Sequence, residues 1–120
     1  MAGVLVDTDV LVDHLRGARR LDLGGAEPYC SVVTRCELFA GQESDEAIVT
    51  QLLAAMNELP IDRAVAEAAG RIRRDTGVRL GDALIASTAI QHGLNLLTRN
   101  RRDFGRINGL AFHDSTTLTS

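Results

Sequence analysis

The sequence contains no lysine. All 13 of its basic residues are arginine, against 16 acidic residues, which gives a net charge of −3 over 120 residues. A lysine ammonium forms the Schiff base of many carbonyl-transforming enzymes and binds phosphate in many phosphotransfer sites, so mechanisms that depend on it are excluded. Arginine is left as the only side chain with a permanent positive charge that can contact an anionic ligand.

Aromatic residues, cysteine and long hydrophobic runs are also scarce. The chain has one tyrosine, three phenylalanines and no tryptophan, so its core must be built from aliphatic side chains. No apolar run approaches the length of a signal-peptide core or a membrane span, and we therefore expect a cytoplasmic protein with no membrane contact. Cys30 and Cys36 have no other cysteine and no histidine nearby, which predicts two buried free thiols.

Short apolar runs alternate with segments of helical periodicity. The run at residues 3–6 has no polar alternation, which is typical of a central parallel strand buried on both faces. Further strands are predicted at 29–33, 58–61, 94–98 and 110–113. Helices are predicted at 9–16, 34–40, 44–56, 62–76 and 82–92, with one more turn within 100–107. This alternation predicts one α/β domain over residues 1–120, with three α/β/α layers around a central parallel sheet.

Polar residues mark the expected helix ends. Thr34 and Glu37 have the spacing of a capping box, and Ser44 and Asp62 precede apolar helical patterns as N-caps. Gly77 is expected to end the helix predicted at 62–76. The helix at 82–92 is apolar nearly all round, which predicts a buried, central position.

Carboxylates stand at the predicted strand ends and helix starts, where ligands bind in open α/β sheets. The polar residues at these places are Asp7, Asp9, Glu37, Asp82, Thr98, Asn100 and Asp103. Taken singly, most of them have an alternative role as helix caps or as partners of a helix dipole. Asp7 favours function because it directly follows four buried strand residues. Asp9 and Asp13 are expected on the exposed side of a short helix, with Asp9 a weak candidate for a supporting role.

Several carboxylates in one crevice repel one another, so such a site is stable only if it binds a cation. Oxygen ligands select Mg²⁺ or Mn²⁺, and the absence of cysteine and histidine beside them argues against zinc. A hard metal with open water positions is suited to phosphate chemistry. The residues therefore predict hydrolysis of a phosphodiester by a metal-activated water.

Three families place acidic residues after a first strand in this way. Asp7-Thr8-Asp9-Val10 resembles the first motif of haloacid-dehalogenase-type phosphatases, and the length resembles a two-component receiver domain, but both families rely on a lysine. The chain resembles the PIN-domain ribonucleases, and among them the VapC toxins of bacterial toxin–antitoxin pairs. The matching blocks, in the order and approximate spacing of that family, are residues 4–11, Ser31 with 34–41, 82–89 and 97–104.

The resemblance implies a PIN-like fold and a metal-dependent endoribonuclease. It implies a Mg²⁺ pocket, with Mn²⁺ as a possible substitute, formed by Asp7, Glu37, Asp82 and Asp103. Asp7 and Asp82 resemble the most direct ligands, and Thr8, Thr98 and Asn100 match supporting positions. The family varies between Asn100 and Asp103, so either of these two can be the one that approaches the metal. The resemblance also implies a homodimer, cleavage of structured RNA such as tRNA, and a VapB-type antitoxin whose basic side chain reaches the pocket.

Two groups of arginines are distinguished by their positions. The first surrounds Asp103, and its members are predicted to hold the RNA backbone: Arg99, Arg101, Arg102 and Arg106. The second lies at a helix end and is assigned to solvent and helix-dipole interactions: Arg71, Arg73, Arg74 and Arg79. The helices at 9–16 and 44–56 are candidate partner surfaces.

Two other functions stay open from the sequence. A PIN-like module could bind RNA or a partner without cutting it, although such a module has no reason to keep four repelling carboxylates. A metal-dependent DNA nuclease would use the same acidic set. Cleavage of matched RNA and DNA, with Mg²⁺ or EDTA, separates these functions.

Overall fold

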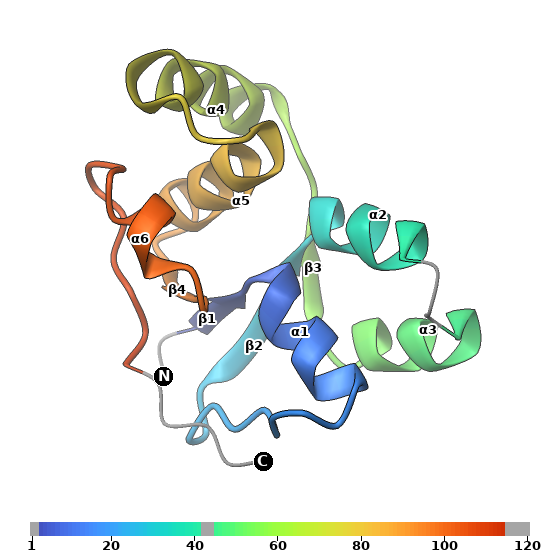
Figure 1. Cartoon of the computed structure of the whole chain (residues 1–120). Coiled ribbons are helices and arrows are strands. Elements are labelled where there is room, and N and C mark those ends of the chain that lie inside the picture. Colours follow the sequence, from blue (N-terminus) through green and yellow to red (C-terminus); the bar gives the residue numbers. More distant parts are fainter. Residues whose placement is uncertain (1–2, 42–44, 115–120) are drawn as a thin grey trace.

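A four-stranded parallel sheet forms the centre of the molecule (Figure 1). The computed structural model describes residues 3–41 and 45–114. The strands are β1 (Gly3–Val6), β2 (Glu27–Ser31), β3 (Asn57–Leu59) and β4 (Asn95–Leu97), in the spatial order β3-β2-β1-β4. β1 is central, pairing with β2 and β4, and its Val4, Leu5 and Val6 are at most 2% exposed. The uninterrupted apolar run at the start of the chain is explained by this burial on both faces.

Helices cover both faces of the sheet, so the predicted three-layer α/β/α fold is confirmed. Strand side chains alternate between two hydrophobic clusters. Val4, Val6 and Cys30 face α1 (Thr8–Leu15), α2 (Val32–Ala40) and α3 (Glu46–Ala54). Leu5 and Leu96 face α4 (Arg63–Thr76), α5 (Leu80–Gln91) and α6 (Arg101–Phe104). The two layers meet at the end of the sheet where β1 and β4 finish.

The start of α2 differs from the prediction. β2 ends at Ser31 instead of continuing to residue 33, because the Ser31 hydroxyl accepts a hydrogen bond from Val33 N at 3.0 Å and caps the helix there. The prediction that Thr34 and Glu37 form a capping box is therefore wrong. Thr34 lies inside the helix and is fully buried, which leaves both side chains available to the site described below.

The other helix ends follow the sequence more closely. Asp62 caps α4 as predicted, and Gly77 ends it with a left-handed conformation (φ 75°) that favours glycine. Ser44 lies outside the described residues, and Asp45 caps α3 by accepting from Ala47 N at 2.9 Å. The strand predicted at 110–113 is reduced to a single bridge between Phe112 and Leu96.

The apolar helix α5 is central, as predicted, and its Ser87 hydroxyl donates to the Val65 carbonyl of α4 at 2.8 Å. It begins at Leu80, two residues before the predicted start, so Asp82 lies within its first turn. Cys30 is buried and its pKa is raised to about 11, mainly by burial, whereas Cys36 is exposed. The prediction of a buried thiol is wrong for Cys36, because it lies on the outer side of α2. In the part of the chain that the structure describes, no helix is long and apolar enough to cross a membrane.

Candidate active site

A cavity of about 400 Å³ opens where the two helical layers meet. Its lining residues come from the positions just after β1 and β4 and from α1, α2 and the start of α5, elements that Figure 1 labels. Its lining residues are Asp7, Thr8, Asp9, Val12, Asp13, Arg16, Glu37, Arg79, Asp82, Arg99 and Asn100. We call it the acidic cleft. It contains three of the four predicted metal-binding carboxylates, and the fourth, Asp103, lies in the adjoining hollow.

Asp7 is held at the floor of the acidic cleft and is only 5% exposed. Its Oδ2 accepts from Thr98 Oγ1 at 2.7 Å and its Oδ1 accepts from Thr8 N at 2.8 Å. Burial, followed by the charge of Asp9, raises the pKa of Asp7 to about 8, against the lowering effect of the Thr98 hydrogen bond. Without a nearby cation, this carboxyl group therefore holds a proton at neutral pH.

Asp9 is more important to the site than the sequence suggested. Its Oδ1 is buried and accepts no hydrogen bond from the described part of the chain. The charge of Asp9 and a side-chain hydrogen bond between the two carboxyl groups both raise the pKa of Asp7. A signal for this placement was present in the sequence, because Asp9, Asp13 and Arg16 share the spacing of one helix face, and all three line the acidic cleft.

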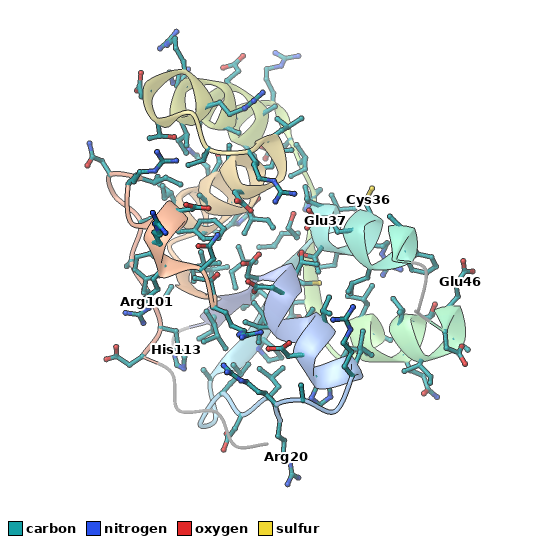
Figure 2. All side chains as sticks on the ribbon, viewed as in Figure 1. Arg20, Cys36, Glu37, Glu46, Arg101 and His113 are labelled. Carbon is teal, nitrogen blue, oxygen red and sulfur yellow. The ribbon has the colours of Figure 1, made fainter. Side chains whose placement is uncertain are left out.

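Glu37 is fixed by two threonines. Thr8 Oγ1 donates to Glu37 Oε1 at 2.6 Å and lies 2.9 Å from Thr34 Oγ1. Because the Thr8 proton is directed to Glu37, Thr34 is the donor in the second contact. Figure 2 shows Glu37 and Cys36 as neighbours on α2, with the Cys36 sulfur on the outer side. The absence of a side chain at Gly81 also matters, since a Cβ there would lie 3.0 Å from Glu37 Oε2.

Thr8→Val should lower the activity of the site about tenfold, because it leaves the Glu37 carboxylate unfixed while keeping nearly the same volume. The thermal midpoint should change by no more than a few degrees, since the bond to Glu37 is exposed. Thr8→Ser, which retains the hydroxyl, is the matched control. Equal rates for the valine and serine variants would contradict the proposed positioning of Glu37.

The charges of other carboxylates of the site influence the pKa of Asp82. Burial raises its pKa, the charges of Glu37, Asp103 and Asp9 raise it further, and the charge of Arg79 lowers it. Glu37, Asp103 and Asp9 thus lie within electrostatic reach of Asp82, and Asp9 also lies within reach of Asp7. Their mutual repulsion has to be offset for the site to be fully ionised.

A hydrogen-bonded chain connects Asp7 to Asp103. Thr98 Oγ1, which donates to Asp7, accepts from Asn100 N at 3.0 Å, and Asn100 Nδ2 donates to Asp103 Oδ2 at 3.0 Å. Asn100 also caps α6 and lines both the acidic cleft and the adjoining hollow. Asn100 thus lines the acidic cleft together with Asp7 and Asp82, and Asp103 is hydrogen-bonded to it from the adjoining hollow.

The oxygen donors of the acidic cleft suit a hard cation. Within residues 3–41 and 45–114, no group of three or more histidine, cysteine or acidic side chains is arranged to hold a metal ion by itself. Mg²⁺ is commonly held by one or two carboxylates, with water and substrate phosphates completing the shell, so this arrangement fits it. The buried Oδ1 of Asp9, which accepts no hydrogen bond from the described residues, and the raised pKa of the neighbouring Asp7 are both consistent with a cation site at this position.

The four arginines predicted to bind RNA divide into two pairs. Arg99 is ion-paired with Asp13. Arg101 lies over the Phe112 ring at 4.9 Å and donates to the His113 carbonyl at 2.9 Å, and Figure 2 shows Arg101 and His113 together at one edge of the molecule. Arg102 and Arg106 line the hollow beside Asp103 and have no ion pair within the described residues. Among the described residues, this second pair makes no ion pair that a ligand would have to displace.

Arg79 was missed by the sequence analysis, which grouped it with the solvent-facing arginines of the preceding helix. It lines the acidic cleft and its charge lowers the pKa of Asp82. It is the N-cap residue of α5, and its side chain makes no capping hydrogen bond. The spacing of Arg79 and Asp82, one helical turn apart, was the available signal.

The model of the PIN domain family matches residues 4–110, a range that includes every carboxylate of the site. This chain belongs to the PIN-domain family. The chain is 40% identical over 109 residues to Ribonuclease VapC10 of Mycobacterium tuberculosis, a match that covers 81% of this chain and 82% of the relative. The resemblance to VapC-type PIN domains is thereby confirmed.

Two further comparisons support this placement among PIN domains. The tRNA(fMet)-specific endonuclease VapC of Shigella flexneri is 28% identical over 130 residues, covering 95% of this chain and 98% of the relative. A solved toxin–antitoxin complex from Klebsiella pneumoniae contains a chain that superposes with a TM-score of 0.79 at 30% identity, covering 95% of this chain and 100% of that chain. This chain and the chain of the Klebsiella complex therefore share the PIN-like fold over nearly their whole length.

Proposed function

We propose that this PIN domain is a VapC-type endoribonuclease, the toxin of a toxin–antitoxin pair, that hydrolyses phosphodiester bonds of structured RNA, with tRNA as the substrate class. The observation that carries the proposal is the acidic cleft itself, in which the buried Asp7 lies with Asp9, Glu37 and Asp82, and the buried Oδ1 of Asp9 accepts no hydrogen bond from the described residues. The ribonuclease names of the relatives and the tRNA specificity in the name of the Shigella relative support it. The whole chain would act as one nuclease domain.

Asp7 and Asp82 would hold a Mg²⁺ ion, or Mn²⁺ in its place, with Glu37, Asp9 and Asp103 acting directly or through water. When bound, the metal would lower the pKa of a water molecule and offset the negative charge of the attacked phosphate. Thr98 and the Thr8 amide orient the Asp7 carboxylate, and the Thr8 hydroxyl orients Glu37. Arg79 faces the same cleft and would bind a nonbridging oxygen of the phosphate.

A VapB-type antitoxin is the proposed partner, supported by the toxin–antitoxin complex of the Klebsiella relative. Large apolar side chains are exposed on α2, α3 and α5: Val32, Phe39, Ile48 and Leu80. An amphipathic antitoxin segment could cover them and direct a basic side chain into the acidic cleft. We also propose that the toxin forms a homodimer.

Cleavage assays with metal control test the proposal. The purified protein should cut total tRNA in Mg²⁺ or Mn²⁺, should not cut DNA of matched sequence, and should be inactive in EDTA. Asp82→Asn should abolish cleavage without lowering the thermal midpoint, because it removes one of several repelling charges. Asp75→Asn, at an aspartate whose side chain is 72% exposed, is the control. Cleavage of DNA at a similar rate, or metal-independent cleavage of RNA, would overturn the assignment.

A further inference from the structure

Three hollows of the surface adjoin one another, because each neighbouring pair shares a lining residue. Asn100 lines both the acidic cleft and the hollow beside α6, which has a volume of about 460 Å³. Arg106 lines that hollow and also a third one of about 310 Å³, which lies against α4, α5 and the segment after α6. We call the two hollows beyond the acidic cleft, which run from Asn100 to the C-terminal half of α4, the arginine path.

We propose that the arginine path holds the single RNA strand on one side of the cleaved bond, with Arg102, Arg106 and Arg71 contacting successive phosphates. This inference rests on the proposed ribonuclease function and adds to it a binding surface for the RNA strand. Arg71 is new to the RNA-binding set, because from the sequence alone it was assigned to the solvent-facing end of a helix.

The charges along the path favour a polyanion. Arg71, Arg102 and Arg106 are exposed, and none of them has an ion pair within the described residues. Two acidic residues also line the path, and each has a partner. Asp103 accepts from Asn100 Nδ2, and Asp75 lies 3.8 Å from Arg74. Three unpaired guanidinium groups therefore face the path, each able to grip a phosphate by two hydrogen bonds.

The third hollow has the composition expected for a nucleotide. Ala68, Ile72, Ile90 and Ile107 provide its apolar surface, against which a base can lie. Arg71 and Arg106 supply positive charge beside that surface, and Thr76 and Asn108 supply hydrogen-bonding groups. No aromatic side chain lines it, so base contact there would be apolar and tolerant of sequence, unlike a stacking platform.

Binding of oligoribonucleotides of two lengths tests the path without knowledge of the natural substrate. The probes are fluorescein-labelled oligouridines of about 6 and about 14 nucleotides, lengths near the lower and upper ends of the range of single-strand sites. They are measured by anisotropy in Mg²⁺ with the full chain carrying Asp82→Asn, which prevents cleavage. The longer probe should bind at least about tenfold more tightly. Arg71→Gln and Arg106→Gln should each remove most of that gain and leave the shorter probe unaffected or nearly so.

Salt dependence gives a second readout. Each arginine that contacts a phosphate should contribute about 0.7 to the slope of log Kd against log salt for a single strand, so each variant should lower the slope by about that amount. Arg63→Gln is the matched control, because Arg63 is an exposed arginine of the same helix that lies outside the path. If Arg63→Gln and Arg71→Gln lose affinity for the longer probe and salt slope to the same extent, the proposed role of the arginine path is wrong.

The failure of this inference is distinguishable from failure of the proposed function. If the protein cuts tRNA in Mg²⁺ but both probes bind equally, the ribonuclease stands and the arginine path is wrong. If Arg71→Gln leaves RNA binding intact and instead weakens a stable complex with the antitoxin, or changes the oligomeric state on size exclusion, the surface belongs to a protein partner. If no RNA is bound or cut under any condition, the proposed function itself fails.

Discussion

Asp7→Asn should abolish metal-dependent RNA cleavage and, in EDTA at pH 8, raise the thermal stability of the protein above that of the wild type. The carboxyl group is buried, its neighbour Asp9 is negatively charged, and its pKa is raised to about 8. Between about pH 4 and pH 8 the folded protein holds a proton that the unfolded chain has released. The stability of the metal-free wild type therefore falls as the pH rises through this window.

The asparagine variant lacks this titration, so its advantage over the wild type should grow from pH 5 to pH 8. Each unit of raised pKa corresponds to about 1.4 kcal/mol, and we expect a gain of about 5 °C or more in Tm at pH 8. Addition of Mg²⁺ should stabilise the wild type and have much less effect on the variant. Thermal melts at both pH values, with EDTA and with Mg²⁺, measure these differences. A variant that melts below the wild type at pH 8 in EDTA would contradict the destabilisation that we attribute to the burial of Asp7 beside the charge of Asp9.

Arg79→Gln should lower kcat about a hundredfold and change KM little, because the guanidinium would act on the charge that develops at the attacked phosphate. A second effect follows from its influence on Asp82. Because the charge of Arg79 lowers the pKa of Asp82, the variant should need a higher pH to ionise that carboxylate. The acidic limb of its pH–rate profile should therefore move to higher pH. This shift separates a role in the site from a general loss of structure.

Two substitutions serve as references for Arg79. Arg79→Lys keeps the charge and should restore the pH profile and part of kcat. Arg74→Gln removes an arginine whose side chain is 73% exposed and should have no effect on either quantity. If Arg79→Gln has the kcat and pH profile of the wild type, the residue has no part in catalysis.

The sequence predicted the layers and the acidic set because both depend on local patterns. An apolar run without alternation predicted the central strand β1, and carboxylates after strands predicted the edge at which they meet. The start of α2 could not be predicted from its capping box, since Ser31 and Thr34 are both plausible caps and tertiary contacts decide between them. Thr34 is buried against Thr8, a residue 26 positions earlier, and no local pattern contains that contact.

The same dependence on long-range contacts explains why the roles of the arginines could not be predicted from the sequence. Counting charges near Asp103 identified four candidates, but only the folded chain shows that Arg99 pairs with Asp13 and that Arg101 lies over Phe112. Arg79 was assigned to solvent because the end of a helix is normally exposed. The turn between α4 and α5 brings it instead to the acidic cleft. Such long-range partners also gave Asp9 its buried oxygen, which the sequence placed on an exposed face.

The acidic cleft takes Asp7, Asp9 and Glu37 from elements of one helical layer and Asp82 and Asn100 from elements of the other. Neither half of the chain can therefore assemble a working centre alone. A nascent polypeptide would therefore lack a complete cleft until β4 and Asn100 have emerged and docked beside β1. For a toxin, this order of synthesis delays activity until the complete fold is present, when an antitoxin can also recognise it.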